Sequence, residues 1–344
     1  MLDTALAQGI AAVPDAPPAL VEFFAQIDAA PVWVDWKRID RGGALFLRSG
    51  VVGIAALSLA CLPMMYRSPA GNKPLVITGQ LLRRAPRRLA ETARFMLETS
   101  RPGGLHRGAE GFSMTVRVRL MHAQVRRLLQ QSGRWNRAWG EPVNQLYLAG
   151  TGITLSVVFL RTLRRLGILV SRDDAEALLA LWRYSSHLMG VLPELQCSTE
   201  AEGWRIIEFM GEFEGAPDDD SRALMNAVMT APYLPWLERY AWRVPMAYDL
   251  SRELVGEALA DQLGYPPRRG WGWLRLAGWP LLAGVEMLQR AIPAVRARAA
   301  RAGTAMAEGI IAEIIAASHA GGGSPTQPQA SRGLEHARAA GGRP

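Results

Sequence analysis

The sequence predicts an all-α protein with a single large helical domain, and three observations carry this prediction. Runs rich in Ala, Leu, Arg and Glu repeat their apolar residues at helical spacing along most of the chain. Short Gly/Pro segments separate these runs, and patterns typical of strands are nearly absent. The chain has 344 residues, of which 49% are hydrophobic, so it is long enough to bury a sizeable core.

Several of the expected helices carry recognisable start and stop signals. Ser171 precedes an acidic first turn and suits the N-cap of one helix. Pro142 precedes another helix and Gly167 ends it, while the acidic run 218–220 with Ser221 begins a third. In chain order we expect helices over 18–27, 40–65, 81–98, 113–131, 143–167, 172–192, 199–213, 218–230, 235–243, 246–263, 272–291 and 295–318.

Composition divides the chain into three parts. Residues 1–40 are predicted to form an N-terminal helical extension, and residues 41–319 the main helical domain. Residues 320–344 are rich in Gly, Pro and Ser and poor in apolar side chains, so they cannot offset the entropy of ordering. We therefore expect a disordered C-terminal tail, which includes His336.

Charge and cysteine usage limit the partners and the compartment. The formal net charge is +8, which permits attraction to anionic surfaces. No recognition motif accompanies the basic residues, so no nucleic-acid partner is predicted. Cys61 and Cys197 belong to no CxxC pair, and the N-terminus does not resemble a secretory signal. These features predict a cytoplasmic protein.

Two apolar segments raise the question of membrane contact. Residues 51–66 are short for a bilayer span and contain Pro63, so a buried helix is expected. Residues 270–280 contain three Trp and suit a membrane–water interface. Peripheral membrane association therefore stays open, as does the oligomeric state.

Common catalytic motifs are missing from the sequence. Without HExxH, HxxxH or CxxC, a zinc or di-iron site held by several side chains is poorly supported. The acidic residues of 208–220 suggest a capped helix start rather than a calcium loop. The GTG run 150–152 follows no strand, and neither GxSxG nor a P-loop occurs.

His122 is the most informative candidate, because it falls within an apolar helical stripe. An unpaired polar group in a core costs a few kcal/mol, so the imidazole of His122 must either form a hydrogen bond or bind a metal. A core histidine bonded to a backbone carbonyl and an axial ligand of haem iron are both consistent with this position. The stripe consists of Val118, Met121, Val125, Leu128 and Leu129.

A second helix supplies a candidate distal face. Arg88 and Thr92 are four residues apart and share one side of the helix, with Phe95 continuing the row. Such a pair can orient dioxygen, although an ordinary amphipathic helix gives the same pattern. Of the other histidines, His106 lies in a predicted loop and His187 near a helix C-terminus, where a structural role is common.

These residues resemble those of a known family. The segments RRLAET (87–92), VRVRLMHAQVRRLL (116–129) and the NQ-containing stretch 139–191 resemble, in order, the DUF2236 family. This is the group of oxygenase MpaB and the rubber oxygenases, or latex clearing proteins. The resemblance is strongest over 66–195.

The resemblance implies a globin-like helical core around haem b. It assigns the proximal iron ligand to His122 and the distal pair to Arg88 and Thr92, with dioxygen on the side opposite the histidine. It also marks two departures: Glu91 replaces a lysine of the rubber oxygenases that caps the iron, and Asn72 replaces a glutamate proposed as their catalytic base. Together with the missing leader, these argue against extracellular rubber as the substrate.

The predicted function is therefore a haem-dependent oxygenase acting on an apolar, isoprenoid or unsaturated lipid substrate, with double-bond cleavage of the dioxygenase type. Arg117, Arg119 and Arg126 are candidates to pair with haem propionates, or else form a solvated face. Two alternatives are a non-catalytic haem sensor or carrier, and a haem-free helical module that binds lipid or a membrane.

Overall fold

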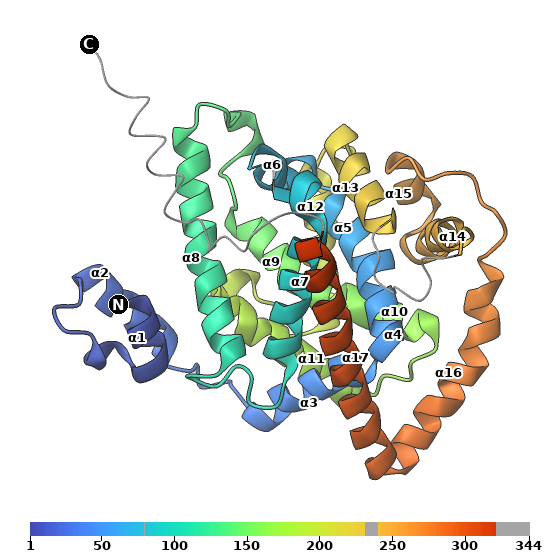
Figure 1. The fold of residues 1–344 in the computed structure, drawn as a ribbon, viewed down its shortest axis with the longest axis horizontal. Helices are drawn as coiled ribbons and strands as arrows, with labels where there is room; N and C mark the ends of the chain where they lie inside the picture. The colour runs from blue at the N-terminus through green and yellow to red at the C-terminus, as the bar shows by residue number, and fades with distance from the viewer. Residues whose placement is uncertain (79, 231–239, 321–344) are drawn as a thin grey trace.

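The protein is built from helices throughout its described part (Figure 1), which confirms the all-α prediction. The computed structural model describes residues 1–78, 80–230 and 240–320, and for 80–89, 275, 314 and 317–320 it describes the backbone alone. No strand occurs in these ranges. The α-helices are α1 (Leu2–Gln8), α2 (Pro18–Asp28), α3 (Trp36–Arg48), α4 (Gly50–Ala56), α5 (Leu62–Tyr66), α6 (Pro69–Ile77), α7 (Gln80–Ser100), α8 (Glu110–Gln131), α9 (Gln145–Ile153), α10 (Phe159–Leu166), α11 (Arg172–Leu188), α12 (Glu200–Phe213), α13 (Asp219–Thr230), α14 (Arg243–Val255), α15 (Glu257–Gln262), α16 (Trp273–Ala291) and α17 (Pro293–Ala320).

Shorter helical turns connect some of these helices. A π-helical turn, Leu57–Cys61, joins α4 to α5, and a second, Thr154–Val158, joins α9 to α10. The two turns pack against each other in the core. Single 3₁₀ turns lie at Ile10–Ala12, Arg137–Trp139 and Pro193–Leu195.

Helix α3 is in close backbone contact with three other helices. A Cβ atom at Gly42 would overlap the carbonyl of Ala177 in α11, and one at Gly43 would overlap the carbonyl of Ser100 in α7. On α17, a Cβ atom at Gly303 would overlap the carbonyl of Leu47. Because only glycine permits such close approach, these positions fix how α7, α11 and α17 pack on α3.

A buried ion network crosses the same region. The Arg48 guanidinium, whose side chain is 2% exposed, donates to Glu286 of α16 at 2.5 Å and to Asp174 of α11 at 3.4 Å. Asp174 also accepts from Arg41 and from Arg296 of α17, both at 2.7 Å. The network therefore ties α3, α11, α16 and α17 together. Removing one partner would leave a buried charge uncompensated.

Three of the predicted helices have different boundaries. The expected helix 40–65 is broken at Ser49, where α3 and the following helical segment meet at 91°. Gly50 takes a positive φ of 51° at this bend. The expected helix 246–263 is likewise divided at Gly256, whose φ is 95°. Helix 143–167 is continuous but passes through the second π-helical turn.

Other differences concern short helices and the chain ends. Helices α1 and α6 were not predicted, because each is too short to show a clear apolar period. The expected helix 235–243 falls mainly outside the described residues, as does the predicted tail 320–344 beyond residue 320.

The N-terminal helices pack onto the main core. Ala5, Leu6, Phe24 and Ile27 belong to its principal apolar cluster. Arg107, in the loop between α7 and α8, donates to the carbonyl of Ala5 at 2.6 Å. Helix α2 covers the expected helix 18–27, and residue 40, the predicted domain boundary, lies inside α3.

Among the described residues, one helical stretch is long and apolar enough to cross a bilayer. It runs Gln145–Leu166, and 67% of its most apolar window is buried within the protein. The apolar segment 51–66 passes this test only together with α3, across the 91° bend. Burial in the core accounts for the apolar character of both, as expected for 51–66.

The ion network makes a first prediction. Asp174→Asn should lower the free energy of unfolding at pH 7 by about 3 kcal/mol, because it removes the buried carboxylate shared by Arg41, Arg48 and Arg296 and leaves Glu286 alone to compensate Arg48. Asp173→Asn is the matched control: this carboxylate is 72% exposed and pairs with Arg41 only, so its loss should cost less than about 1 kcal/mol. Urea unfolding measures both.

The pH dependence of stability sharpens this test. Burial would raise the pKa of Asp174, but hydrogen bonds from Arg41 and Arg296 outweigh it, and the pKa falls from 3.8 to about 2. Because the pKa of Asp174 is lower in the folded state than in the unfolded state, its carboxylate stabilises the fold at pH values above the unfolded pKa. This stabilisation is lost as the pH falls toward the folded pKa. Between pH 5 and pH 3 the wild type should lose about 1 kcal/mol more than Asp174→Asn. Equal losses would contradict this role.

Candidate functional site

Helices α7 and α8 form an antiparallel hairpin that carries the predicted site residues. Near its loop, a Cβ atom at Gly111 would approach the carbonyl of Glu98 to 2.5 Å, so the two helices are in backbone contact there. The amide of Phe112 donates to the carbonyl of Gly104 at 2.9 Å and closes the loop. The hairpin therefore has a fixed register at its base.

This register sets the height of each predicted residue along the hairpin. At 1.5 Å per residue, His122 lies about 16 Å above Gly111 along α8. The backbone of Arg88 lies about 15 Å above Glu98 along α7. His122 and Arg88 are thus level with each other, and Thr92 lies about one turn closer to the loop.

The inward face of α8 is centred on His122. Thr115 and Leu129 are fully buried, whereas Val118, His122 and Val125, between them on the same stripe, are half-buried. The stripe predicted from the sequence included Met121 and Leu128, and this was wrong, since they are 39% and 57% exposed. The inward position of His122 is as expected, although its burial is partial.

The matching face of α7 also becomes more exposed with distance from the loop of the hairpin. Met96 and Thr99 are buried, while Thr92, on the same side of the helix, is exposed. Phe95 turns toward the core and packs against Trp182 at a ring distance of 6.4 Å. The side chain of Arg88 lies outside the described residues, so its predicted role stays a prediction.

This donor set fits a planar cofactor that needs one axial ligand. Haem supplies four ring nitrogens of its own and requires a single protein imidazole beside an apolar surface. On α8 a half-accessible imidazole has apolar neighbours one turn above and below it, Val118 and Val125. His122 would hold the iron, and Val118 and Val125 would contact the macrocycle.

The three arginines expected to serve haem propionates are engaged elsewhere. Arg126 donates to the carbonyls of Pro142 and Val143, at 3.1 and 2.6 Å, and so anchors the segment before α9. Arg117 pairs with Asp3 of α1 at 2.6 Å. Arg119 donates to Gln26 of α2 at 3.1 Å and to the carbonyl of Leu188 at 3.3 Å.

These contacts join α8 to its neighbours in the fold. Arg119 also lies 5.0 Å from the ring of Phe23, and burial lowers its pKa. Arg117 is exposed, in agreement with a solvated face, whereas Arg119 and Arg126 are half-buried and hydrogen-bonded within the fold; the propionate role stays a prediction. These partners lie between 16 and 114 residues away along the chain, and helical periodicity does not indicate them.

Asn72, one of the two departures from the rubber oxygenases, has a structural role. Its side chain is 2% exposed in α6, and its amide donates to the carbonyl of Tyr66 at 2.7 Å and to Ser221 at 3.0 Å. The amide thus connects α6 to the start of α13. Glu91, the other departure, lies on an exposed part of α7.

The acidic run 218–220 begins α13, as predicted. Asp218 accepts from the amide of Ser221 at 2.9 Å, which is N-cap geometry. Lys73 donates to Asp218 at 2.6 Å and to Asp220 at 2.5 Å. A lysine therefore neutralises the carboxylates that were weighed as calcium ligands.

The remaining described histidines next to aromatic rings have packing roles. His187 stacks on Tyr184 with ring centroids 6.0 Å apart and meets Trp33 edge-on. Burial, and then the charge of Arg119, lower the pKa of His187. His106 is exposed and lies 4.1 Å from the ring of Trp36.

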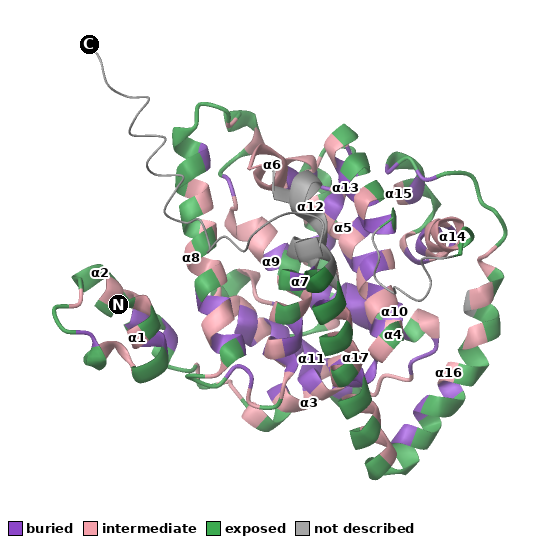
Figure 2. Cartoon of the chain, in the orientation of Figure 1, coloured by how far each residue is buried: buried purple, intermediate pink, exposed green. Residues whose placement is uncertain are grey.

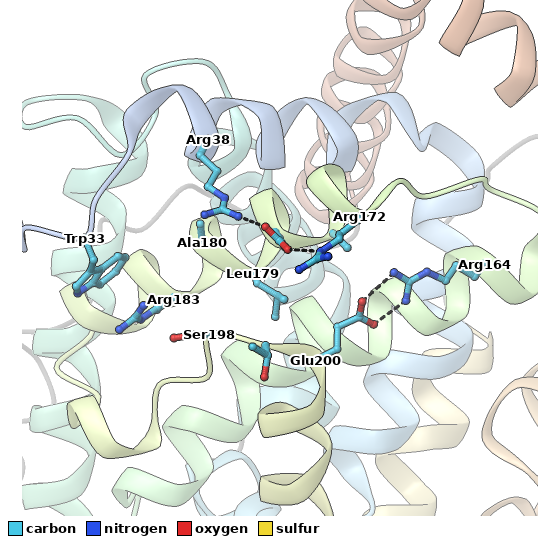
Figure 3. A pocket seen from close by; sticks show the side chains of 12 residues that line it. Trp33, Arg38, Arg164, Arg172, Leu179, Ala180, Arg183, Ser198 and Glu200 are labelled. Atoms are coloured by element: carbon cyan, nitrogen blue, oxygen red, sulfur yellow. Dashed lines mark hydrogen bonds and ion pairs between the residues drawn. The ribbon is translucent and has the colours of Figure 1, made fainter.

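A solvent-open cavity lies elsewhere, between α3, α10, α11 and α12 (Figure 3). It has a volume of about 660 Å³, is open to solvent and contains none of the predicted site residues. Glu176 binds two of its arginines and Glu200 a third, while Arg183 stacks 4.1 Å over Trp33. Its charged side chains come from helices that are distant in the sequence, so helical periodicity did not indicate this groove. They are Arg38, Arg164, Arg172, Glu176, Arg183 and Glu200.

Comparisons with known proteins agree with the helical fold. The model of a family described as "ER-bound oxygenase mpaB/B'/Rubber oxygenase, catalytic domain" matches residues 36–285. The rubber oxygenase of Streptomyces sp. (strain K30) is 25% identical over 290 residues, which cover 82% of this chain and 69% of that protein. A structure of latex clearing protein in the closed state superposes with a TM-score of 0.68 at 24% identity, covering 89% of this chain and 83% of that one.

The hydrogen bonds of Asn72 make a second prediction. Asn72→Asp replaces an amide donor with a carboxylate acceptor that faces the carbonyl of Tyr66. The free energy of unfolding should therefore fall by about 2 kcal/mol. Asn136→Asp is the control, because Asn136 only accepts, from the amide of Ala138 at 3.0 Å, and aspartate can do the same. Thermal unfolding followed by circular dichroism compares the two. A stable, fully folded Asn72→Asp would reopen this position to a catalytic role.

Proposed function

The chain belongs to the MpaB and rubber oxygenase family, a family of oxygenases, and from this we propose that it is a haem b-dependent oxygenase of apolar substrates. The family match covers residues 36–285, more than half of the chain. The single observation that carries the cofactor proposal is His122, half-buried at the centre of the inward face of α8. On the paired helix, the backbone of Arg88 stands level with it.

The chain's own residues have distinct tasks in this proposal. His122 holds the iron as proximal ligand, and a hydrogen bond to its second ring nitrogen would set its basicity. Bound haem would supply the chemistry of dioxygen. Arg88 and Thr92 would orient dioxygen by donating hydrogen bonds to it from α7.

The surroundings of the site favour an apolar substrate. Val118, Val125 and Met96 line the faces of the hairpin next to His122 and Thr92 and would exclude water from the reacting atoms. An isoprenoid or unsaturated lipid chain, cleaved at a double bond, is the substrate class that we propose. The side chain of Asn72 is hydrogen-bonded within the fold, so in this proposal residue 72 does not act as a catalytic base.

A haem-binding experiment tests the cofactor. The protein expressed with adequate haem should show a Soret band, and His122→Ala should lose most of its haem. His187→Ala is the matched control, since this half-buried histidine packs against aromatic rings on α11. A colourless wild type, or a His122→Ala variant with full haem content, would exclude the proposed ligand and favour a haem-free lipid-binding module.

A turnover experiment separates an oxygenase from a haem sensor or carrier. Isoprenoid and unsaturated lipid substrates are incubated under ¹⁸O₂, and the products should carry the label. Thr92→Val should keep its haem and lower kcat by roughly tenfold or more, because one hydrogen-bond donor to the reacting oxygen is lost. If haem is bound and no substrate acquires label, the sensor or carrier function is favoured instead.

A further inference from the structure

Helix α16 exposes an apolar ridge on the outside of the molecule. Figure 1 shows α16 along the edge of the fold, meeting α17 at a sharp corner, and Figure 2 shows that most of its residues are exposed. Five large apolar side chains on it are 50–72% exposed. These five define the α16 ridge: Trp273, Leu276, Leu281, Met287 and Leu288.

The spacing of the ridge places it on one side of the helix. At about 100° per residue its five members fall within an arc of about 140° around the helix axis, so they share the outward half of the helix. The opposite side holds Ala283, Glu286 and Gln289, which are all buried. Glu286 binds Arg48 at 2.5 Å, and Gln289 donates to Glu286 at 3.1 Å.

The polarity of α16 is therefore inverted. A surface helix of a water-soluble protein turns its apolar stripe inward and its charged residues outward. Here the ion-pairing residues face the protein, and the apolar stripe faces away from it. Contiguous exposed apolar surface of this kind marks an interaction site with a protein or a membrane.

The charge around the ridge identifies the partner. Residues 264–307 contain one acidic residue, Glu286, and it is fully buried against Arg48. Arg269, Arg298 and Arg301 are exposed, and no acidic partner is found for them among the described residues. The seven arginines of this segment are Arg268, Arg269, Arg275, Arg290, Arg296, Arg298 and Arg301.

We propose that the α16 ridge docks this protein onto an anionic lipid bilayer. The ridge would lie in the interface, with Trp273 and its leucines among the acyl chains and the arginines at the headgroups. A second copy of the chain fits less well, because two such basic surfaces would repel each other across a dimer axis. The proposal concerns binding alone and does not depend on haem or on turnover.

Vesicle binding tests this surface on the full chain. Sedimentation with phosphatidylcholine vesicles that contain phosphatidylglycerol should carry the protein down, and pure phosphatidylcholine should carry down much less. Leu276→Ser, Leu281→Ser and Met287→Ser combined should lower the partition coefficient by roughly tenfold or more. Arg298→Gln with Arg301→Gln should weaken binding and its dependence on salt.

The matched control uses exposed apolar residues elsewhere. Phe209 and Phe213 on α12 are 51% and 70% exposed, and Phe209→Ser with Phe213→Ser should bind vesicles as the wild type does. The ridge variant should fold, because the three substituted side chains point to solvent, and circular dichroism checks this. Wild-type protein that stays in the supernatant with anionic vesicles would overturn the proposal, as would equal binding by the ridge variant. The wild type could instead fail to bind vesicles and form a dimer in light scattering, with the ridge variant monomeric. That outcome would show that the ridge binds a second copy of the chain.

Discussion

The buried contact of Arg48 with Glu286 and Asp174 is the constraint on which the rest of the fold depends. Burying a guanidinium that is only 2% exposed is costly unless carboxylates lie beside it, and each carboxylate here comes from a different helix. Glu286 brings α16 to α3, and Asp174 brings α11, with Arg296 of α17 on its other side. Four helices are thereby placed by a set of charges that is satisfied only when all of them are present.

The candidate site inherits its position from this arrangement. Because α3 is fixed, the close contact of Gly43 with the carbonyl of Ser100 places the end of α7. The loop that follows is closed on Gly104 and Gly111, so the register of α8 against α7 is set at the base of the hairpin. His122 lies about three turns above this base, and so its height depends on contacts well removed from it.

The sequence was informative where the signal was local. The apolar periodicity of α8 correctly predicted that His122 faces inward, since a single apolar stripe on one helix is enough to indicate its inward face. Met121 and Leu128 were misplaced because an apolar residue at the edge of a stripe is exposed or buried according to its neighbours, which periodicity does not reveal. Arg126 and Asn72 show the same limit: their partners are backbone carbonyls and a hydroxyl that only the folded chain brings near. The bend at Ser49 was missed because a single glycine within an apolar run is compatible with a continuous helix.

The same buried charges favour the observed orientation of α16, in which Glu286 faces inward. Turning α16 over would bury its ridge, at a gain of about 2 kcal/mol for each large apolar side chain. It would also expose Glu286 and leave Arg48 without its nearest carboxylate, a loss of about 3–5 kcal/mol for a broken buried pair, and remove the hydrogen bond from Gln289. The gain summed over the five ridge side chains, about 10 kcal/mol, exceeds this loss, so the ion pair alone does not account for the outward orientation of the ridge in water. An apolar partner for the ridge removes this competition, because both faces of α16 are then satisfied at once. An ion network that organises the core and an apolar surface that meets a bilayer are in this way two consequences of one helix orientation.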